Sequence, residues 1–161
     1  MKAIRVYLIL VATILFSSIG QIFSQANGEE SFSEMEAQIL KLVNEHRKSI
    51  GLNELQYNKF IHAEALNHSK NMANEVVPFS HDGFDGRYER LIKKIGGSSM
   101  AENVANGQSD AESVVASWLE STGHKQNIEG NYNLTGIGIA RGKDGELFFT
   151  QIFLWYKPIK K

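Results

Sequence analysis

The segment LTGIGIARGKDGELFFTQIFLW, residues 134–155, decides the fold class. Two apolar runs, Leu134–Ala140 and Leu147–Trp155, flank the glycine-bearing stretch at residues 142–145, a pattern typical of a β-hairpin. In the second run the odd and the even positions are both apolar, apart from the pair Thr150-Gln151. Because alternate residues of a strand point to opposite faces, we expect a sheet that is covered on both faces.

Four earlier segments have the periodicity of helices that would cover this sheet. Apolar residues recur at helical spacing in each segment, and residues such as Gly51 and Pro78 separate them. The segments cover residues 31–50, 58–75, 87–95 and 109–123. Helices on both faces of one sheet give three layers, so the sequence predicts an α+β fold arranged as an α/β/α sandwich.

The first 26 residues are predicted to be a secretory signal peptide. Lys2 and Arg5 precede an apolar run over residues 6–20, which is shorter than the ~20 residues that span a bilayer. An uncleaved membrane anchor is the alternative. The predicted division of the chain is a signal peptide over residues 1–26, a short lead over 27–34, one domain over 35–156 and a basic tail over 157–161. We therefore expect a secreted, extracellular or cell-envelope protein.

Composition narrows the classes of function. The chain has 17 Lys and Arg and 18 Asp and Glu, and removal of the signal peptide with Lys2 and Arg5 leaves 15 basic and 18 acidic residues. No basic surface for nucleic acid is expected, and we expect a monomer. The sequence contains no cysteine, which excludes disulfides and thiolate chemistry. Any metal would therefore need histidine and carboxylate ligands.

Three polar residues are candidates for a functional site. They are His81 in FSHDGF, Glu102 in AENVA and His124 in STGHKQNI. Each lies at the edge of a predicted regular element, where loops present functional groups from a rigid frame. Two imidazoles and one carboxylate can form a zinc site with an open position for water, or a general acid and base pair.

The same residues also have structural interpretations, which the spacing leaves open. The ring of His81 can hydrogen-bond within its own turn, and His124 can cap the end of the preceding helix, where the negative end of the helix dipole favours an imidazolium. Glu102 lies between two apolar stretches, and burial of an unpaired carboxylate is expensive. We therefore expect a positive or hydrogen-bond-donating group to contact Glu102.

Five motifs occur in the order typical of one protein family. They are NEHR at residues 44–47 with Gly51-Leu52, FSHDGF, AENVA, Trp118 followed by GHKQNI, and GIG at 136–138 with FTQIF at 149–153. From about Met35 to Trp155 the sequence resembles the CAP superfamily, named for cysteine-rich secretory, antigen 5 and pathogenesis-related 1 proteins. It is most similar to the cysteine-free bacterial SCP-like branch. The resemblance implies a central antiparallel sheet and an open cleft, where two histidines and two acids can hold a divalent metal such as zinc.

The family pattern carries over to this sequence only in part. His81 corresponds to the first histidine, Glu102 to the acid of the family's Gly-Glu-Asn motif, and His124 to the histidine of the bacterial branch. The second acid of the eukaryotic pattern corresponds to Ser121 here, and Glu120 lies one residue away, which leaves open whether Glu120 joins the site. The resemblance implies a ligand cleft formed by His81, Asp82, Glu102, Asn103, His124 and Gln151, with His81, Glu102 and His124 as metal ligands and Glu102 and His124 as candidates for catalysis.

Two classes of function are compatible with such a cleft. The first is a binding module for an extracellular small molecule, lipid, glycan or protein, which we favour because no serine lies in a Gly-x-Ser-x-Gly turn or beside an obvious base. The alternative is a metal-assisted hydrolase of peptides or other esters and amides, in which His81 and His124 hold the ion and Glu102 is a ligand or base. Zinc or another divalent metal is the cofactor that either class could use.

Overall fold

The computed structural model describes residues 32–157. The chain divides into two units, Met1–Glu34 and Met35–Lys161, and the sheet and the candidate site lie in the second. The predicted signal peptide, most of the predicted lead and the last four residues of the predicted tail lie outside the described residues. Within the described range, every helix is too short or too polar to cross a bilayer.

The described part of the chain contains one two-residue strand, three longer strands and several helices. The first helix covers residues 32–49. The remaining elements are β1 (Gln56–Tyr57), α2 (Lys59–Ala73), α3 (Phe84–Ile95), β2 (Ser99–Asn106), α4 (Ala111–Glu120), α5 (Thr122–Ile128), β3 (Leu134–Arg141) and β4 (Leu147–Trp155). The predicted hairpin is confirmed as β3 and β4, and the first three predicted helices are confirmed within a few residues at each end.

The sheet has the strand order β1-β3-β4-β2. β3 pairs antiparallel with β4, and β4 pairs antiparallel with β2, so these three long strands form the predicted antiparallel sheet. β1 pairs with β3 in parallel and only over two residues, which adds a short parallel pair that the sequence did not predict. The strands β1 and β2 are therefore the two edges of the sheet.

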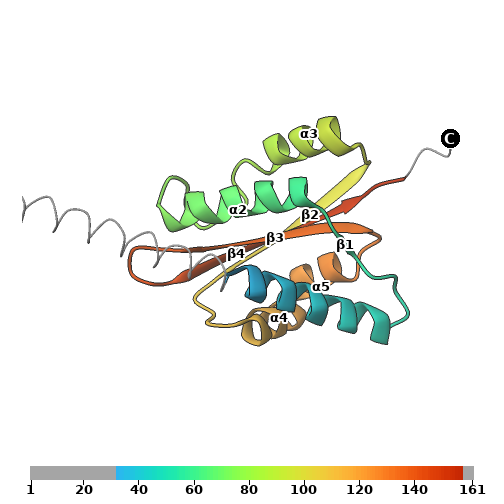
Figure 1. Cartoon of the computed structure of the whole chain (residues 1–161), viewed down its shortest axis with the longest axis horizontal. Coiled ribbons are helices and arrows are strands. Elements are labelled where there is room, and N and C mark those ends of the chain that lie inside the picture. The colour runs from blue at the N-terminus through green and yellow to red at the C-terminus, as the bar shows by residue number, and fades with distance from the viewer. Residues whose placement is uncertain (1–31, 158–161) are drawn as a thin grey trace, which may run out of the picture. The chain divides into compact units, whose positions relative to one another are not determined.

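Helices cover both faces of the sheet, which confirms the predicted three-layer sandwich. α2 and α3 lie on one face, and the first helix, α4 and α5 lie on the other (Figure 1). α2 approaches β3 closely because Gly136 and Gly138 have no side chains, and a Cβ atom at either position would overlap the α2 backbone at His62 or Leu66. Two small residues in β3 thus set the distance between the helix and the sheet.

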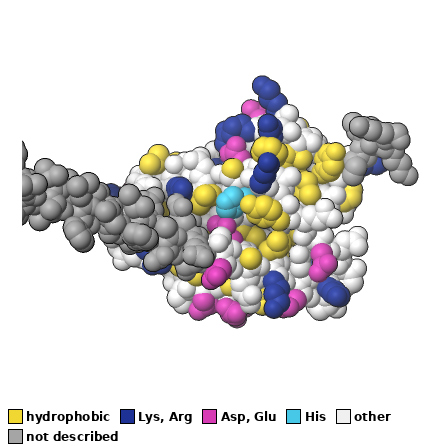
Figure 2. Space-filling view, in the orientation of Figure 1, with side chains coloured by type: hydrophobic (Ala, Val, Ile, Leu, Met, Phe, Trp, Pro, Cys, Tyr) yellow, Lys and Arg dark blue, Asp and Glu magenta, His cyan; other side chains and the backbone are white. Residues whose placement is uncertain are grey.

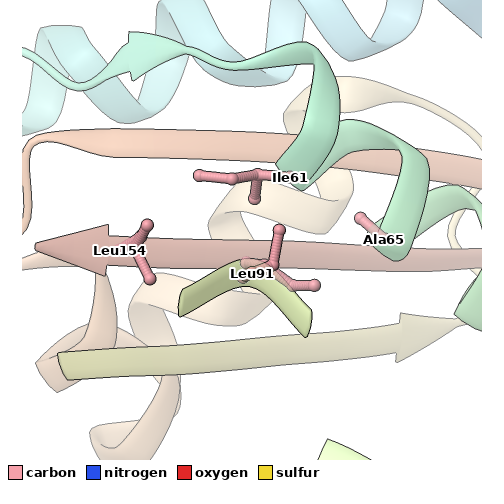
Figure 3. Packing of buried hydrophobic residues seen from close by; sticks show 5 residues of the cluster. Ile61, Ala65, Leu91 and Leu154 are labelled. Atoms are coloured by element: carbon pink, nitrogen blue, oxygen red, sulfur yellow. The ribbon is translucent and has the colours of Figure 1, made fainter. Parts of the chain in front are cut away.

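Each face of the sheet has its own hydrophobic core. On the α2 side, residues from α2, α3 and β4 pack together (Figure 3), namely Ile61, Ala65, Leu91, Ile152 and Leu154. In β4, Phe149 and Phe153 alternate with Ile152 and Leu154, so they point to the opposite face, and both are fully buried. Trp118 of α4 is also fully buried. The apolar character of both parities of β4 therefore follows from its position between two cores.

Side chains cover the part of the β3 edge that β1 is too short to pair. The backbone N–H of Ile139 donates to Glu36 Oε1 at 3.1 Å, and His62 Nδ1 lies 2.6 Å from the carbonyl oxygen of Ile137. The same His62 nitrogen lies 3.4 Å from Glu36 Oε2. Figure 2 shows histidine and acidic side chains together on the face that it presents. Glu36 and His62 thus take the place of a neighbouring strand, which protects an otherwise open edge.

The prediction that the fourth helix runs to about Gly123 is wrong about where this helix ends. α4 ends at Glu120, Ser121 has an extended backbone with φ −86° and ψ 120°, and a separate helix, α5, starts at Thr122. His124 is therefore in the first turn of α5. It does not follow the end of a helix, so the interpretation of His124 as a cap on the preceding helix is also wrong.

Candidate functional site

A tight turn between α2 and α3 fixes the position of His81. The backbone N–H of Asp82 donates to Ser80 Oγ at 3.1 Å, and the N–H of Phe84 donates to the carbonyl oxygen of His81 at 3.0 Å. Gly83 has a φ of 76°, a left-handed conformation that favours glycine, and it directly precedes α3. The predicted turn at FSHDGF is confirmed, and its geometry holds His81 at the start of α3.

Glu102 lies below this turn with a fully buried side chain. Arg87 of α3 donates to both carboxylate oxygens, from Nε to Oε2 at 2.8 Å and from Nη2 to Oε1 at 2.7 Å. Such a bidentate pair is among the strong interactions available to a buried carboxylate. The positive group that the sequence led us to expect next to Glu102 is therefore Arg87.

His68 of α2 completes the buried part of the site. Its Nε2 lies 2.9 Å from the carbonyl oxygen of Ser80, so Nε2 carries the proton and donates it. Its Nδ1 then accepts from Arg87 Nη1 at 3.2 Å. Burial lowers the pKa of His68, and the charge of Arg87 lowers it further. A neutral His68 thus connects the His81 turn to the guanidinium group.

The ring of His81 is oriented by Glu102. His81 Nδ1 lies 3.0 Å from Glu102 Oε1, and since an ionised carboxylate only accepts, Nδ1 carries the proton. The Nε2 atom forms no hydrogen bond with the described residues, and the side chain is 52% exposed. The result is an accessible imidazole nitrogen whose orientation is set by a buried Arg87–Glu102 pair.

His124 approaches this region from the opposite layer of the sandwich. Glu102 pairs with Ile152 and so points to the α2 side, whereas the next residue, Asn103, points to the α5 side. Asn103 Nδ2 donates to the carbonyl oxygen of His124 at 3.1 Å, which holds α5 against β2. Burial lowers the pKa of His124, and the charge of His81 lowers it further. His81 and His124 are therefore held on opposite sides of β2, one next to Glu102 and the other by Asn103.

Comparison with known proteins gives the family. The model of the cysteine-rich secretory protein family, CAP, matches residues 40–153, which is most of the chain. The chain belongs to the CAP family. This match includes His81, Glu102 and His124 and every described strand except the last two residues of β4. The resemblance found in the sequence motifs is thus confirmed.

Proteins similar to this chain include bacterial ones. The chain is 32% identical to the uncharacterized protein YkwD of Bacillus subtilis over 128 residues, which is 77% of this chain and 48% of YkwD. It is 30% identical to an extracellular SCP-domain protein of Bacillus anthracis, with a TM-score of 0.66 over 78% of this chain and 41% of that one. A cysteine-rich secretory protein of Staphylococcus aureus, 23% identical, has the same fold with a TM-score of 0.68 over 79% of this chain and 40% of that one. This chain therefore spans less than half the length of these relatives.

The CAP site of this chain does not fit the predicted metal centre. Among residues 32–157, no group of three or more His, Asp, Glu or Cys side chains is arranged to hold a metal ion. The physical reason is Arg87, which donates to both oxygens of Glu102 and places a positive charge beside them. The carboxylate that was predicted as a metal ligand thus already has a cationic partner.

Several other residues predicted for the CAP cleft have different positions. Gln151 is fully buried, and its Nε2 donates to Thr135 Oγ1 at 3.3 Å, so it does not reach the surface of the site. Asn103 is also buried and supports α5 from below. Asp82 contributes its carbonyl oxygen, which accepts from Arg87 Nη1 at 2.8 Å. Glu120 is exposed at the end of α4.

Sequence reasoning found neither Arg87 nor His68 as a site residue. His68 is buried in the centre of the cluster, and both of its ring nitrogens are hydrogen-bonded. A signal for Arg87 was present, because it follows the glycine of FSHDGF by four residues, one helical turn. A helix started one turn earlier, at Phe84, would have directed Arg87 back toward the turn.

Proposed function

We propose that this CAP domain is an extracellular binding module whose recognition surface is formed by His81 and His124 on the two sides of β2. The observation that supports it most strongly is the chain of contacts from Arg87 through Glu102 to His81 Nδ1. These contacts fix the orientation of the His81 ring and leave its Nε2 atom free for a ligand. Preorganisation of this kind lowers the cost of binding.

The loop that carries His81 also exposes apolar side chains, which form an apolar rim and indicate a ligand with an apolar part. Phe79 is 49% exposed and Val76 is 70% exposed, and both belong to the loop that carries His81. The loop begins at Glu75, which has a φ of 58°, a strained conformation for a residue other than glycine. Strain at a surface loop is often associated with function. The rim and the imidazole together suit an amphipathic ligand.

The chemistry of the site favours a carboxylate as the polar end of that ligand. A protonated His81 can donate from Nε2 to a carboxylate, while the charge of Glu102 is already balanced by Arg87. His124 contributes a second imidazole across β2. We therefore propose a ligand with a short apolar chain that ends in a carboxylate.

Sodium hexanoate and the uncharged hexan-1-ol form a matched pair of probes for this proposal. In NMR titrations near pH 6, hexanoate should shift the ring signals of His81 and His124 and the backbone signals of Val76 and Phe79, more than hexan-1-ol does. His81→Ala should weaken hexanoate binding by about tenfold, because a charge-assisted hydrogen bond is lost. Shifts confined to other parts of the chain would contradict the proposal.

The matched control is His46→Ala. His46 Nε2 lies 2.9 Å from Glu129 Oε1, so this variant also breaks an imidazole–carboxylate contact, but outside the site. His46→Ala should leave hexanoate binding unchanged.

Calorimetry with zinc chloride distinguishes the proposed binding module from the alternative, a metal-assisted hydrolase. Tight zinc binding that is lost in a His81→Ala/His124→Ala variant would replace the proposed module with a metal site.

A further inference from the structure

A concave surface lies at the edge of the sheet opposite β2, where β1 joins β3. Its volume is about 870 Å³, and none of its lining residues belongs to the His81 site. Five of the lining residues carry side-chain amides, namely Asn44, Asn53, Gln56, Asn58 and Asn133. Glu54 is the only charged lining residue among those that the structure describes. We call this surface the amide groove.

Two of the amides fix the walls of the groove. Asn44 Nδ2 donates to the carbonyl oxygen of Leu55 at 3.0 Å, and Asn44 Oδ1 accepts from the N–H of Leu55 at 2.8 Å. Asn133 binds Tyr156 in the same way, with Nδ2 donating at 2.6 Å and Oδ1 accepting at 2.9 Å. Both amides clamp the backbone of an adjacent segment in both directions. The groove is therefore preformed.

Other polar groups in the groove have no partner within the described residues. The side chains of Asn53, Glu54 and Gln56 form no hydrogen bond there. Asn58 uses Oδ1 to accept from the N–H groups of Phe60 and Ile61, which leaves its Nδ2 available. The groove thus offers two complete carboxamides, one additional amide donor and one carboxylate to a ligand.

This set of groups matches the hydroxyls of a sugar. A carboxamide has a donor and an acceptor side by side, and neighbouring sugar hydroxyls both donate and accept. The described lining contains no Lys or Arg to attract a phosphate, and a single carboxylate is a weak cation site. One aromatic ring is also present, because Tyr156 lines the groove. Tyrosine presents an apolar ring face to a ligand together with a polar tip.

An extended peptide fits the groove less well. Peptides commonly bind to a sheet edge by adding a strand, and the edge strand here, β1, has only two residues. Such a short strand offers few backbone hydrogen bonds to a partner. We propose that the amide groove binds a neutral oligosaccharide.

NMR titrations of the protein with chitotriose and with maltotriose test this proposal. At least one of these neutral trisaccharides should shift the side-chain amide signals of Asn53 and Gln56 and the ring signals of Tyr156. Gln56→Ala and Asn53→Ala should each weaken its binding by about fivefold, which corresponds to the loss of one or two hydrogen bonds. Gln126→Ala removes an exposed amide on α5 and should leave sugar binding unchanged.

Two results would overturn the inference, and neither depends on the His81 site. One is the absence of any shift at the groove with both trisaccharides while the variants keep the wild-type fold. The other is a groove response to acetyl-trialanine amide in place of the sugars, which would make the groove a peptide site. His81→Ala should leave sugar binding intact, so the two proposals fail separately.

Discussion

Replacing Arg87 with methionine is expected to lower the free energy of unfolding by about 3–5 kcal/mol. Glu102 is fully buried, and Arg87 donates to both of its oxygens at 2.8 and 2.7 Å. Without the guanidinium, an uncompensated carboxylate would remain in the interior, and removing one partner of a buried pair is far costlier than removing both. Urea unfolding at pH 7, followed by circular dichroism, measures the loss.

A matched control is available on the same helix. Arg90 also makes a bidentate pair, with Glu64 at 2.8 Å through each nitrogen, but its side chain is 57% exposed. Arg90→Met should cost less than about 1 kcal/mol, because exposed ion pairs contribute little. The double variant Arg87→Met/Glu102→Leu should be more stable than Arg87→Met alone. If Arg87→Met and Arg90→Met lowered the free energy of unfolding equally, the stabilising role of the buried Arg87–Glu102 pair would be contradicted.

Replacing Glu36 with glutamine is expected to stabilise the protein above pH 7. Burial raises the pKa of Glu36 from 4.5 to about 7, although the N–H of Ile139 and the charge of Lys70 oppose this effect. A folded state that holds a proton more tightly than the unfolded state loses stability as the pH rises from 4.5 to 7. The loss amounts to about 3 kcal/mol, and glutamine, which cannot ionise, would avoid it.

The difference in the free energy of unfolding between Glu36→Gln and wild type separates the titration of Glu36 from that of the other ionisable groups, which both proteins share. Urea unfolding between pH 4 and pH 9 should give a difference near zero at pH 4 that grows to about 3 kcal/mol in favour of the variant at pH 8. Glutamine retains an acceptor for the N–H of Ile139, so the cover of the β3 edge persists. Glu112→Gln, on the exposed surface of α4, is the control. A difference that does not vary with pH would show that Glu36 is not buried as described.

The sequence predicted the architecture because its strongest signals are local. The apolar pattern of β4 required two covered faces, and the helical periods supplied the two layers. The break between α4 and α5 was missed because Ser121 is not a helix breaker such as proline, and its extended backbone depends on contacts of α5 with β2. The parallel β1 has only two residues, which is too short for a periodicity.

Only the part of the candidate site that lies in local sequence motifs could be predicted. His81 and Glu102 lie in short distinctive motifs, and the structure joins them directly at 3.0 Å. Arg87 and His68 lie within ordinary helical sequence, and their role depends on where α2 and α3 cross the sheet. Gln151 was expected in the cleft, but the pairing of Asn103 with Gln151 directs both to the other face. Such facing is set by strand register, which a single sequence does not fix.

The orientation of His81 by Glu102 can be measured directly from its ring tautomer. Long-range ¹H–¹⁵N correlation spectra of the labelled protein near pH 8 distinguish a proton on Nδ1 from one on Nε2. Because Nδ1 lies 3.0 Å from Glu102 Oε1, we expect His81 to carry its proton on Nδ1, and Glu102→Leu to abolish that preference. A proton on Nε2, or a spectrum that Glu102→Leu leaves unchanged, would contradict a preorganised recognition site.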